Sequence, residues 1–453
     1  MCGILGGSNP KWNCQKALQS MSHRGPNGHR LVSMGTFTLG FCRLSIIDLS
    51  DRAMQPMLSE DGKTAIVFNG EIYNYLEIKK QLLQEGIVFR TESDTEVILR
   101  AYLAYGFDFI YKIDGMFAIA ILDMSKKQLF LFRDRMGIKP LYYITENGNI
   151  AFASELKCIK DLMPEKSFII DNTAIYDFLF YQYIPDPKTM YLNVKKLEPA
   201  SYIVYDIEKN KIADSGKYWN LKLNTCKSSD GVDLGEARFH LKELVHDAVK
   251  HQMVADVPVG TFLSGGVDSS VISYECSTLS HDIKAFCTGY KEKAYDEAPF
   301  AQEVADAIGI DLIKNRMDLS VAQQLYPDIF MWFDEPFGDT TAYANFLVSK
   351  DIRKNVTVAL SGDGGDEVFG GYERYSVFEN APHRGILGSI YRKCWHRCGW
   401  DNILASDMMK VGDEVEKYAF TGGFGFEDRI RTNLNEVRRN LSIDKDYDVL
   451  WHF

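Results

Sequence analysis

The chain has 453 residues, of which 46% are hydrophobic and 25% charged, a composition that argues against disorder. At this length about three domains are expected. The formal net charge of -11 argues against nucleic acid and anionic membranes as partners, because these are bound through basic patches. No apolar run approaches the roughly 20 residues of a membrane span, and no apolar signal segment follows Cys2. We therefore expect a cytoplasmic protein with no membrane or nucleic-acid partner.

The first half of the chain predicts a mostly antiparallel sheet. Its apolar runs are short, and turn pairs such as Asp61-Gly62 and Asn147-Gly148 separate them, as in hairpins. Helical patterns cover residues 75–84 and 93–105, and the second opens on a capping box formed by Ser93 and Glu96. The predicted strands are residues 37–39, 64–68, 117–122, 128–132 and 201–205.

From Glu236 onward strands and helices alternate, which predicts a parallel, doubly wound sheet. Between the halves, the polar stretch 206–233 predicts an interdomain linker. We expect domains at residues 2–205 and 236–453, joined by residues 206–235. In the second half the predicted strands are residues 257–263, 284–288 and 357–360, and the predicted helices are residues 241–249, 269–277 and 296–308.

Nine cysteines, odd in number and widely spaced, do not predict a disulfide framework, so most are expected to be buried thiols in a reducing compartment. Cys2 differs, because removal of Met1 would leave it with a free α-amine. Such an amine has a pKa of about 7.7–8.0 and can accept the thiol proton without a histidine. The alternative is that Cys2 is an incidental residue at a frayed terminus.

Polar residues at predicted strand ends and helix starts supply what hydrolysis of the side-chain amide of glutamine needs. Arg43 can bind the α-carboxylate in a bidentate fork, while Glu71 and Asp94 can hold the α-ammonium. Amide cleavage creates an oxyanion, which Asn69 and the backbone N–H of Gly70 can stabilise. Taken singly, each of these residues is as readily a turn residue or part of a surface ion pair.

Together these residues resemble the glutaminase domain of class II glutamine amidotransferases, which use an N-terminal nucleophile. The resemblance implies an α+β fold with αββα layers, in which Cys2, Asn69 and Gly70 are catalytic. It further implies that glutamine is bound by Arg43, Asn69, Gly70, Glu71 and Asp94. The same resemblance extends over about 200 residues through His23-Arg24-Gly25-Pro26, Asp114-Gly115-Met116-Phe117-Ala118, Arg133-Asp134-Arg135, Gly137-Ile138-Lys139-Pro140-Leu141 and Ala153-Ser154-Glu155.

A second motif, Ser264-Gly265-Gly266-Val267-Asp268-Ser269-Ser270, follows a predicted strand and opens a predicted helix. Small residues there let backbone N–H groups converge on an anion at a helix N-terminus, and Asp268 is placed to hold a divalent cation. The motif lacks the Gly-Lys-Ser/Thr ending of loops that serve γ-phosphate transfer. The alternative is a purely structural turn.

A third motif, Ser361-Gly362-Asp363-Gly364-Gly365-Asp366-Glu367, follows another strand, and three acids there are costly without a cation. The alternative is a flexible acidic loop. Both loops resemble those of N-type ATP pyrophosphatases. We expect Asp268 and Asp366 to bind the metal and Asp363 to contact the acceptor amine or act as a base. The residues expected to bind ATP are Leu263, Ser264, Gly265, Gly266, Asp268, Ser269, Ser270, Ser361 and Gly362.

The two halves in this order resemble the glutamine-hydrolysing asparagine synthetase family, to which Tyr295-Asp296-Glu297 and Phe333-Asp334-Glu335-Pro336-Phe337 are also similar. The resemblance implies Mg²⁺ as cofactor and glutamine, aspartate and ATP as substrates. Aspartate would be adenylated, and ammonia from glutamine would displace AMP after crossing an apolar interdomain passage. Two alternatives stay open: a related enzyme that amidates another carboxylate, for example in surface polysaccharide assembly, and a glutaminase-only fragment.

The family normally continues through a helical region with a lysine-containing stretch that contacts the phosphates, and no such stretch occurs in this chain. Residues 447–453 resemble the start of that region. We therefore expect a synthetase half that is incomplete at its C-terminus. The sequence leaves open both a homodimer and a second polypeptide that completes this half.

Overall fold

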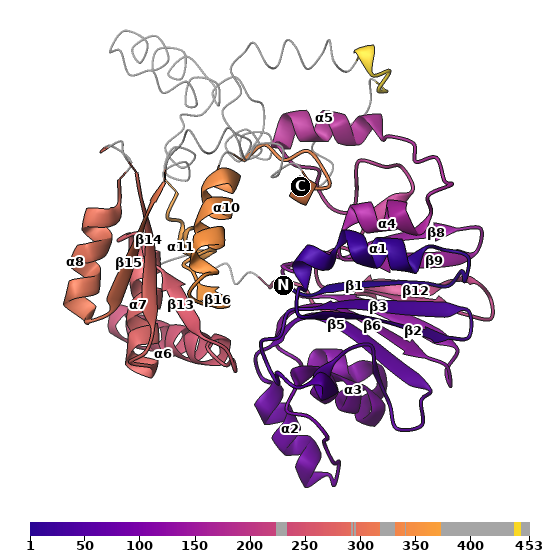
Figure 1. Cartoon of the computed structure of the whole chain (residues 1–453), viewed down its shortest axis with the longest axis horizontal. Coiled ribbons are helices and arrows are strands. Elements are labelled where there is room, and N and C mark those ends of the chain that lie inside the picture. Colours follow the sequence, from indigo (N-terminus) through magenta and orange to yellow (C-terminus); the bar gives the residue numbers. More distant parts are fainter. Residues whose placement is uncertain are drawn as a thin grey trace.

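The computed structural model describes residues 1–222, 233–290, 293, 296–317, 331–339, 341–372 and 439–444. The predictions on Tyr295 and on residues 447–453 lie outside these ranges. Within them, two units stand side by side: one built on two antiparallel sheets, the other on a parallel sheet (Figure 1). No helix among the described residues is long and apolar enough to cross a membrane.

The first unit contains two six-stranded sheets packed face to face. The first has the order β10-β8-β9-β1-β3-β2 and the second the order β12-β11-β7-β6-β5-β4. The strands of the first are β1 (Gly3–Gly7), β2 (Gly28–Met34), β3 (Phe37–Arg43), β8 (Tyr142–Glu146), β9 (Asn149–Ala153) and β10 (Val194–Lys196). Those of the second are β4 (Met57–Leu58), β5 (Thr64–Ile72), β6 (Gly115–Asp123), β7 (Gln128–Arg133), β11 (Ser201–Asp206) and β12 (Lys211–Lys217).

Helices cover the outer face of each sheet, which completes the expected αββα layers (Figure 1). On the first sheet lie α1 (Cys14–Ser20) and α4 (Leu156–Leu162), and on the second α2 (Tyr75–Gln84) and α3 (Asp94–Tyr105). Side chains alternate between the faces of a strand, so Ile66 of β5 packs toward the helices and Val67 into the core between the sheets. Remaining elements are α5 (Asn172–Tyr181) and the 3₁₀ turns η1 (Ser22–Arg24), η2 (Asp51–Ala53) and η3 (Gly106–Tyr111).

The second unit has a four-stranded parallel sheet in the order β15-β14-β13-β16, as the alternation predicted. Its strands are β13 (Val259–Phe262), β14 (Lys284–Tyr290), β15 (Asp311–Met317) and β16 (Val358–Leu360). Its helices are α6 (Leu234–Gln252), α7 (Val267–Leu279), α8 (Ala298–Ile308), α10 (Thr341–Ile352) and α11 (Gly365–Phe369). The strand β15 and the helix α10 are absent from the sequence-based prediction.

The structure corrects the predicted linker of residues 206–235 at its start. Strand β12 lies within that range and pairs with β11, from Ser201 opposite Lys217 to Asp206 opposite Lys211. The Tyr218 hydroxyl also donates a hydrogen bond to the Arg133 carbonyl, at 2.8 Å. The first unit therefore extends well beyond residue 205. The strand was missed because it is a polar, exposed edge strand, the kind that natural sheets use to avoid aggregation.

Candidate active site

The Cys2 thiol lies at the end of the central strand of the first sheet. Because Gly3 of β1 pairs with Cys42 of β3, Cys2 lies beside Arg43 at the end of β3. The Leu44 backbone N–H donates to Cys2 Sγ at 3.3 Å, and Arg24 Nε donates to the Cys2 carbonyl at 2.8 Å. Burial raises the pKa of the Cys2 thiol. A thiol with a raised pKa can act as a nucleophile only if a nearby base accepts its proton.

Five of the predicted glutaminase residues line one small cavity. Its walls include Cys2, Arg43, Gly70, Glu71 and Asp94, and its volume is about 30 Å³. That space holds a water molecule or two.

Two of these wall residues are carboxylates: Asp94 is buried and Glu71 is partly buried. Asp94 is the first residue of α3, and its carboxylate accepts the Ile72 N–H at 3.3 Å. Burial raises the pKa of Asp94 to about 7. Burial, and then the negative charge of Asp94, raises the pKa of Glu71 well above its ordinary value. Neither carboxylate forms an ion pair within the described part of the chain, although the charges of Lys139 and of the N-terminal amine act on Glu71 and oppose the rise of its pKa.

Asn69 lies next to this wall, in β5, and not on it. Its side chain is 1% exposed, and its Nδ2 has no hydrogen-bond partner among the described residues. A buried donor without a partner costs about 1–3 kcal/mol, which is typical of a group kept for a ligand. Gly70 follows it, and a Cβ there would lie 2.1 Å from the Met116 carbonyl oxygen. Glycine is thus required by the pairing of β5 with β6 as well as by any close approach of substrate.

The guanidinium of Arg43 is held by the loop that follows β3. Arg43 Nη1 donates to the Ser50 carbonyl at 2.7 Å and Nη2 donates to the Asp48 carbonyl. The side chain is 5% exposed. The direction in which Arg43 points is therefore set by residues 44–50, here called the Arg43 loop.

Two basic residues near Cys2, Arg24 and Lys139, were part of the sequence motifs but were not predicted as site residues. Arg24 Nη2 is buried without a partner among the described residues, like Asn69 Nδ2. Lys139 is 4% exposed, and its Nζ lies 2.8 Å from Met1 Sδ. Burial lowers the pKa of Lys139 to about 8 and that of the Met1 amine to about 6. Their only sequence signal was membership in a motif.

The loop from Ser264 to Ser270 joins β13 to α7, as predicted. Its hydroxyls organise it internally: Ser264 Oγ accepts the Gly266 N–H at 3.2 Å, and Ser270 Oγ donates to the Gly266 carbonyl at 2.6 Å. Gly265 has φ +88°, a conformation that L side chains rarely adopt. The helix begins after Gly266, so its first N–H groups face the open side of the loop.

The acidic loop after β16 lies directly against Asp268. A Cβ on Gly362 would lie 2.7 Å from Asp268 Cβ, and one on Gly365 would lie 2.6 Å from Asp268 Cγ. The structure thus brings together two segments about 100 residues apart in the chain. Asp363 accepts a hydrogen bond from Ser361 Oγ at 2.9 Å, while the Asp366 carboxylate lies against Gly371.

The residues around Asp268 can be compared with the ligands that Mg²⁺ usually has in nucleotide sites. No three His, Cys, Asp or Glu residues gather as a metal cage among the described residues. Magnesium in nucleotide sites is usually held by one or two carboxylates together with the phosphates, and not by a protein cage. A single carboxylate, Asp268, fits that use, because it belongs to the loop from Ser264 to Ser270. This loop, predicted to bind an anion, is here called the anion loop. No geometry joins Asp366 to Asp268, so its ligand role stays a prediction.

Thr288 at the carboxyl end of β14 was not singled out from the sequence. Its hydroxyl is buried without a partner among the described residues. It lies at the edge of the parallel sheet where Leu263 and the anion loop begin, the edge at which α/β sheets bind ligands. Nothing in its local sequence distinguishes it from an ordinary strand threonine.

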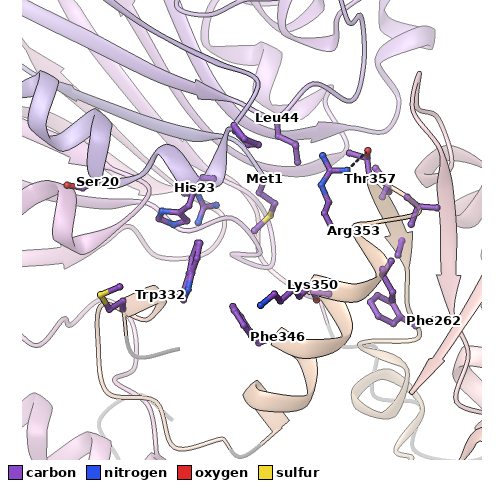
Figure 2. A pocket seen from close by; sticks show the side chains of 18 of the residues that line it. Met1, Ser20, His23, Leu44, Phe262, Trp332, Phe346, Lys350, Arg353 and Thr357 are labelled. Atoms are coloured by element: carbon purple, nitrogen blue, oxygen red, sulfur yellow. Dashed lines mark hydrogen bonds between the residues drawn. The ribbon is translucent and has the colours of Figure 1, made fainter. Parts of the chain in front are cut away.

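A larger cavity of about 1240 Å³ lies between the two units (Figure 2). Met1, His23 and Leu44 line it from the first unit. Phe262 and Phe346 line it from the second, at the end of β13 and along α10. It thus extends from the neighbours of Cys2 to the strand that carries the anion loop.

The fold and these two sites define a class of protein: an N-terminal-nucleophile glutamine amidotransferase unit followed by a nucleotide-binding synthetase unit. Family models agree, with a glutamine amidotransferase domain matching residues 1–219 and an asparagine synthase domain matching residues 240–411. The chain belongs to the glutamine-hydrolysing asparagine synthetase family.

Two relatives give the extent of the similarity. The glutamine-hydrolyzing asparagine synthetase 1 of Bacillus subtilis is 36% identical over 83% of this chain and 59% of its own length. A second such synthetase, assigned in Methanocaldococcus jannaschii, is 37% identical over 82% of this chain and 76% of its own length. The chain therefore spans between three fifths and three quarters of these relatives.

Among solved structures, the chain is similar to glutamine phosphoribosylpyrophosphate amidotransferase of Bacillus subtilis, complexed with ADP and GMP. The TM-score is 0.38 at 18% identity, over 71% of this chain and 70% of that one. A likeness this low carries no argument about function.

Proposed function

We propose that the protein makes L-asparagine from L-aspartate, using ammonia released from L-glutamine and the energy of ATP. Water and the three substrates would give asparagine, glutamate, AMP and pyrophosphate. The observation that carries the proposal is a pair of carboxylates, the buried Asp94 and the partly buried Glu71, on the wall of the Cys2 cavity. Six described cysteines are free thiols, which supports a place in the reducing cytoplasm.

Glutamine hydrolysis follows from the residues around Cys2. Once Met1 is removed, the α-amine of Cys2 takes the thiol proton and the thiolate attacks the side-chain amide carbonyl. Asn69 Nδ2 and the Gly70 N–H stabilise the resulting oxyanion. The C–N bond then breaks to release ammonia, and water hydrolyses the thioester to glutamate. Arg43 holds the substrate carboxylate, and Asp94 with Glu71 holds its ammonium.

Aspartate activation belongs to the second unit. The N–H groups around Gly265 and Gly266 bind the phosphates that leave as pyrophosphate. Asp268 is the residue best placed to hold Mg²⁺, which when bound neutralises phosphate charge, and Asp366 is a second candidate ligand. The aspartate carboxylate displaces pyrophosphate to form an acyl-adenylate, and ammonia displaces AMP from it. Asp363 lies on the loop facing this reaction.

Ammonia must reach the adenylate before it is protonated or lost to solvent. The cavity between the units supports a passage, because Leu44 at one end contacts Cys2 and Phe262 at the other precedes the anion loop. These residues and Phe346 are apolar, whereas Arg24, Lys157, Lys350 and Arg353 give the same cavity charged wall segments. The sequence alone did not identify these lining residues.

The test is a product assay on the full chain. Glutamine alone should give glutamate, and addition of Mg-ATP and aspartate should give AMP and asparagine in equal amounts. Cys2→Ala should abolish both uses of glutamine and spare synthesis from ammonium salts. Cys158→Ala is the matched control, since that thiol is buried in a helix-facing core away from the cavity and should change neither activity.

Other results distinguish the alternatives. Glutamate without AMP would identify a glutaminase-only protein. AMP formed with another carboxylate, and not with aspartate, would identify a related amidotransferase with a different acceptor. If Cys2→Ala still hydrolysed glutamine, Cys2 would not be the nucleophile.

A further inference from the structure

The turn between α6 and β13 reaches from the second unit to the Arg43 loop of the first. The backbone N–H of Asp256, in this turn, donates to the Ile46 carbonyl at 2.9 Å. In return the Asp48 N–H donates to Asp256 Oδ2 at 2.7 Å. Two bonds in opposite directions fix the orientation of the loop as well as its distance, because one bond alone leaves rotation free.

The loop held in this way forms part of the cavity wall beside Cys2. Ile46 and Ile47 line the cavity, and the carbonyl of Asp48 is one of the two acceptors that orient Arg43. Asp48 itself has φ +50°, a conformation that persists outside glycine only where the surroundings hold it. A continuous chain of hydrogen bonds therefore links Asp256 to Asp48 and Asp48 to Arg43.

Within the first unit the start of the loop is held by the Leu44 N–H on Cys2 Sγ and the Ser45 N–H on Asn27 Oδ1, and its later part by the side chain of Asp48. Asp48 Oδ2 accepts the Glu92 N–H at 2.8 Å, and Asp48 Oδ1 accepts the Ser50 N–H at 3.0 Å. Both bonds involve the side chain of Asp48. Its backbone N–H bonds instead to Asp256 of the second unit. Asp256 supplies the carboxylate acceptor for that N–H, and hydrogen bonds to a charged group are stronger than neutral ones.

We infer that Asp256 is a positioning residue for glutamine. It acts through Asp48 on Arg43, so a residue of the synthetase unit completes the glutamine site of the other unit. The inference rests on the proposed function for the identity of the ligand. The clasp itself, the pair of bonds between Asp256 and the Arg43 loop, stands independently of that identity.

A general role in docking the two units is the competing explanation, and the chain offers a control for it. His251 Nε2, at the end of α6, lies 3.5 Å from Glu77 Oε1 of α2, across the same junction. That contact does not touch the Arg43 loop. His251→Ala therefore weakens docking without removing the clasp, whereas Asp256→Ala removes the carboxylate half of the clasp.

Two measurements on the full chain test the inference. Amide hydrogen exchange at Asp48 and Ser50 should accelerate in Asp256→Ala and stay unchanged in His251→Ala. In a glutaminase assay Asp256→Ala should raise KM for glutamine roughly 3- to 10-fold with kcat nearly unchanged, as expected for a lost, partly exposed hydrogen bond. Asp256→Asn, which keeps an oxygen acceptor, should restore most of both.

The outcomes separate this inference from the proposed function. Equal effects of the two alanine variants, or no effect of Asp256→Ala, would overturn the positioning role. Accelerated exchange in Asp256→Ala alone would support the clasp, even if no variant and no wild-type protein consumed glutamine. That last result would overturn the proposed function instead.

Discussion

At the scale of single residues, the site contains buried polar groups that lack a hydrogen-bond or ionic partner among the described residues. Asn69 Nδ2 and Arg24 Nη2 are buried donors without partners among the described residues. Asp94 is buried and Glu71 partly buried, and neither forms an ion pair with a cation in the same part of the chain. Such groups reduce stability, and they persist where a ligand supplies the missing partner.

Asn69→Ala tests the oxyanion role of the orphaned donor. The change should lower kcat for glutamine hydrolysis by about 10²–10³ and leave KM nearly unchanged, because the interaction forms only in the transition state. The loss of stability should be small, since the removed donor was already unsatisfied. Steady-state kinetics and denaturant unfolding measure the two effects. A rise in KM alone would place Asn69 in substrate binding instead.

Asp94→Asn tests whether the raised pKa of Asp94 makes the stability of the protein depend on pH. Burial raises the pKa of Asp94 from 3.8 to about 7 in the folded protein, so the folded state holds a proton that the unfolded state releases. Wild-type stability should therefore fall as pH rises between those values and level off above them. The asparagine variant, which can still accept the Ile72 N–H, should lack this component.

Unfolding at pH values below, within and above that interval measures the difference. The variant should gain stability relative to wild type as pH rises, while its KM for glutamine increases because the ammonium has lost a carboxylate. A stability difference that did not change with pH would show that Asp94 is ionised throughout, against its burial.

At the scale of elements, much of the first unit could be predicted because local sequence carries its signals. Residues 75–84 form α2 as expected, and Ser93 caps α3 by accepting the Glu96 N–H. The capping box is incomplete, since the Glu96 carboxylate accepts the N–H groups of Arg90 and Thr91 instead. Strands β5 and β7 were recognisable because both faces of their sheet are buried, which makes them continuously apolar.

What local sequence does not encode is which distant segments meet. The pairing of Gly365 with Asp268, or of Asp256 with Asp48, spans about 100 or 200 positions and depends on the whole fold. The position of Lys139 beside Met1, where its side chain is buried, is likewise not indicated by any residue near it in the sequence. Five of the six predicted glutaminase residues line one cavity and Asn69 lies beside it, while the residues that position them were not predicted.

One element, residues 331–339, belongs by sequence to the second unit and docks on the first. Lys157 Nζ lies 3.3 Å from Asp334 Oδ1 and 3.1 Å from Glu155 Oε2, and Lys196 Nζ lies 2.8 Å from Glu335 Oε2. Trp332 packs edge-on against His23, with ring centroids 4.3 Å apart, at the mouth of the interdomain cavity (Figure 2). Burial raises the pKa of Asp334, so its charge depends on Lys157.

Lys157→Met should therefore loosen this element. Removal of one partner leaves the Asp334 carboxylate buried without its cation, at a cost of about 1.4 kcal/mol once partial exposure of the pair is taken into account. The Gly338 N–H, which donates to the Gln182 carbonyl at 2.8 Å, should exchange about tenfold faster. Lys16→Met, which removes an exposed ion pair with Asp161, is the control and should leave this amide unchanged. An unchanged rate in Lys157→Met would assign the docking to Glu335 instead.

At the scale of the whole molecule, the two proposed sites lie in different units, and contacts between the units connect them. The Cys2 cavity lies in the first unit, and the loop from Ser264 to Ser270 lies at the far end of β13 from the Asp256 clasp. Met1 and Leu44 reach the same interdomain cavity as Phe262. A defect in the nucleotide site should therefore leave glutamine hydrolysis intact, provided that β13 stays in place.

Gly365→Ala tests this separation. Its Cβ would lie 2.6 Å from Asp268 Cγ, and because this is the end of a side chain, the carboxylate can swing aside while the fold survives. Displacement of the proposed metal ligand should weaken Mg-ATP binding roughly 10- to 100-fold, as measured by calorimetry. The glutaminase rate should stay within about twofold of wild type, since kinetic effects of distant, unlinked sites are nearly additive. Gly235→Ala, whose Cβ would approach only the Asp233 carboxylate at 3.1 Å, controls for the substitution itself. Normal Mg-ATP affinity in Gly365→Ala would remove Asp268 from the metal site, whereas a parallel loss of glutaminase activity would show that the two units are coupled through β13.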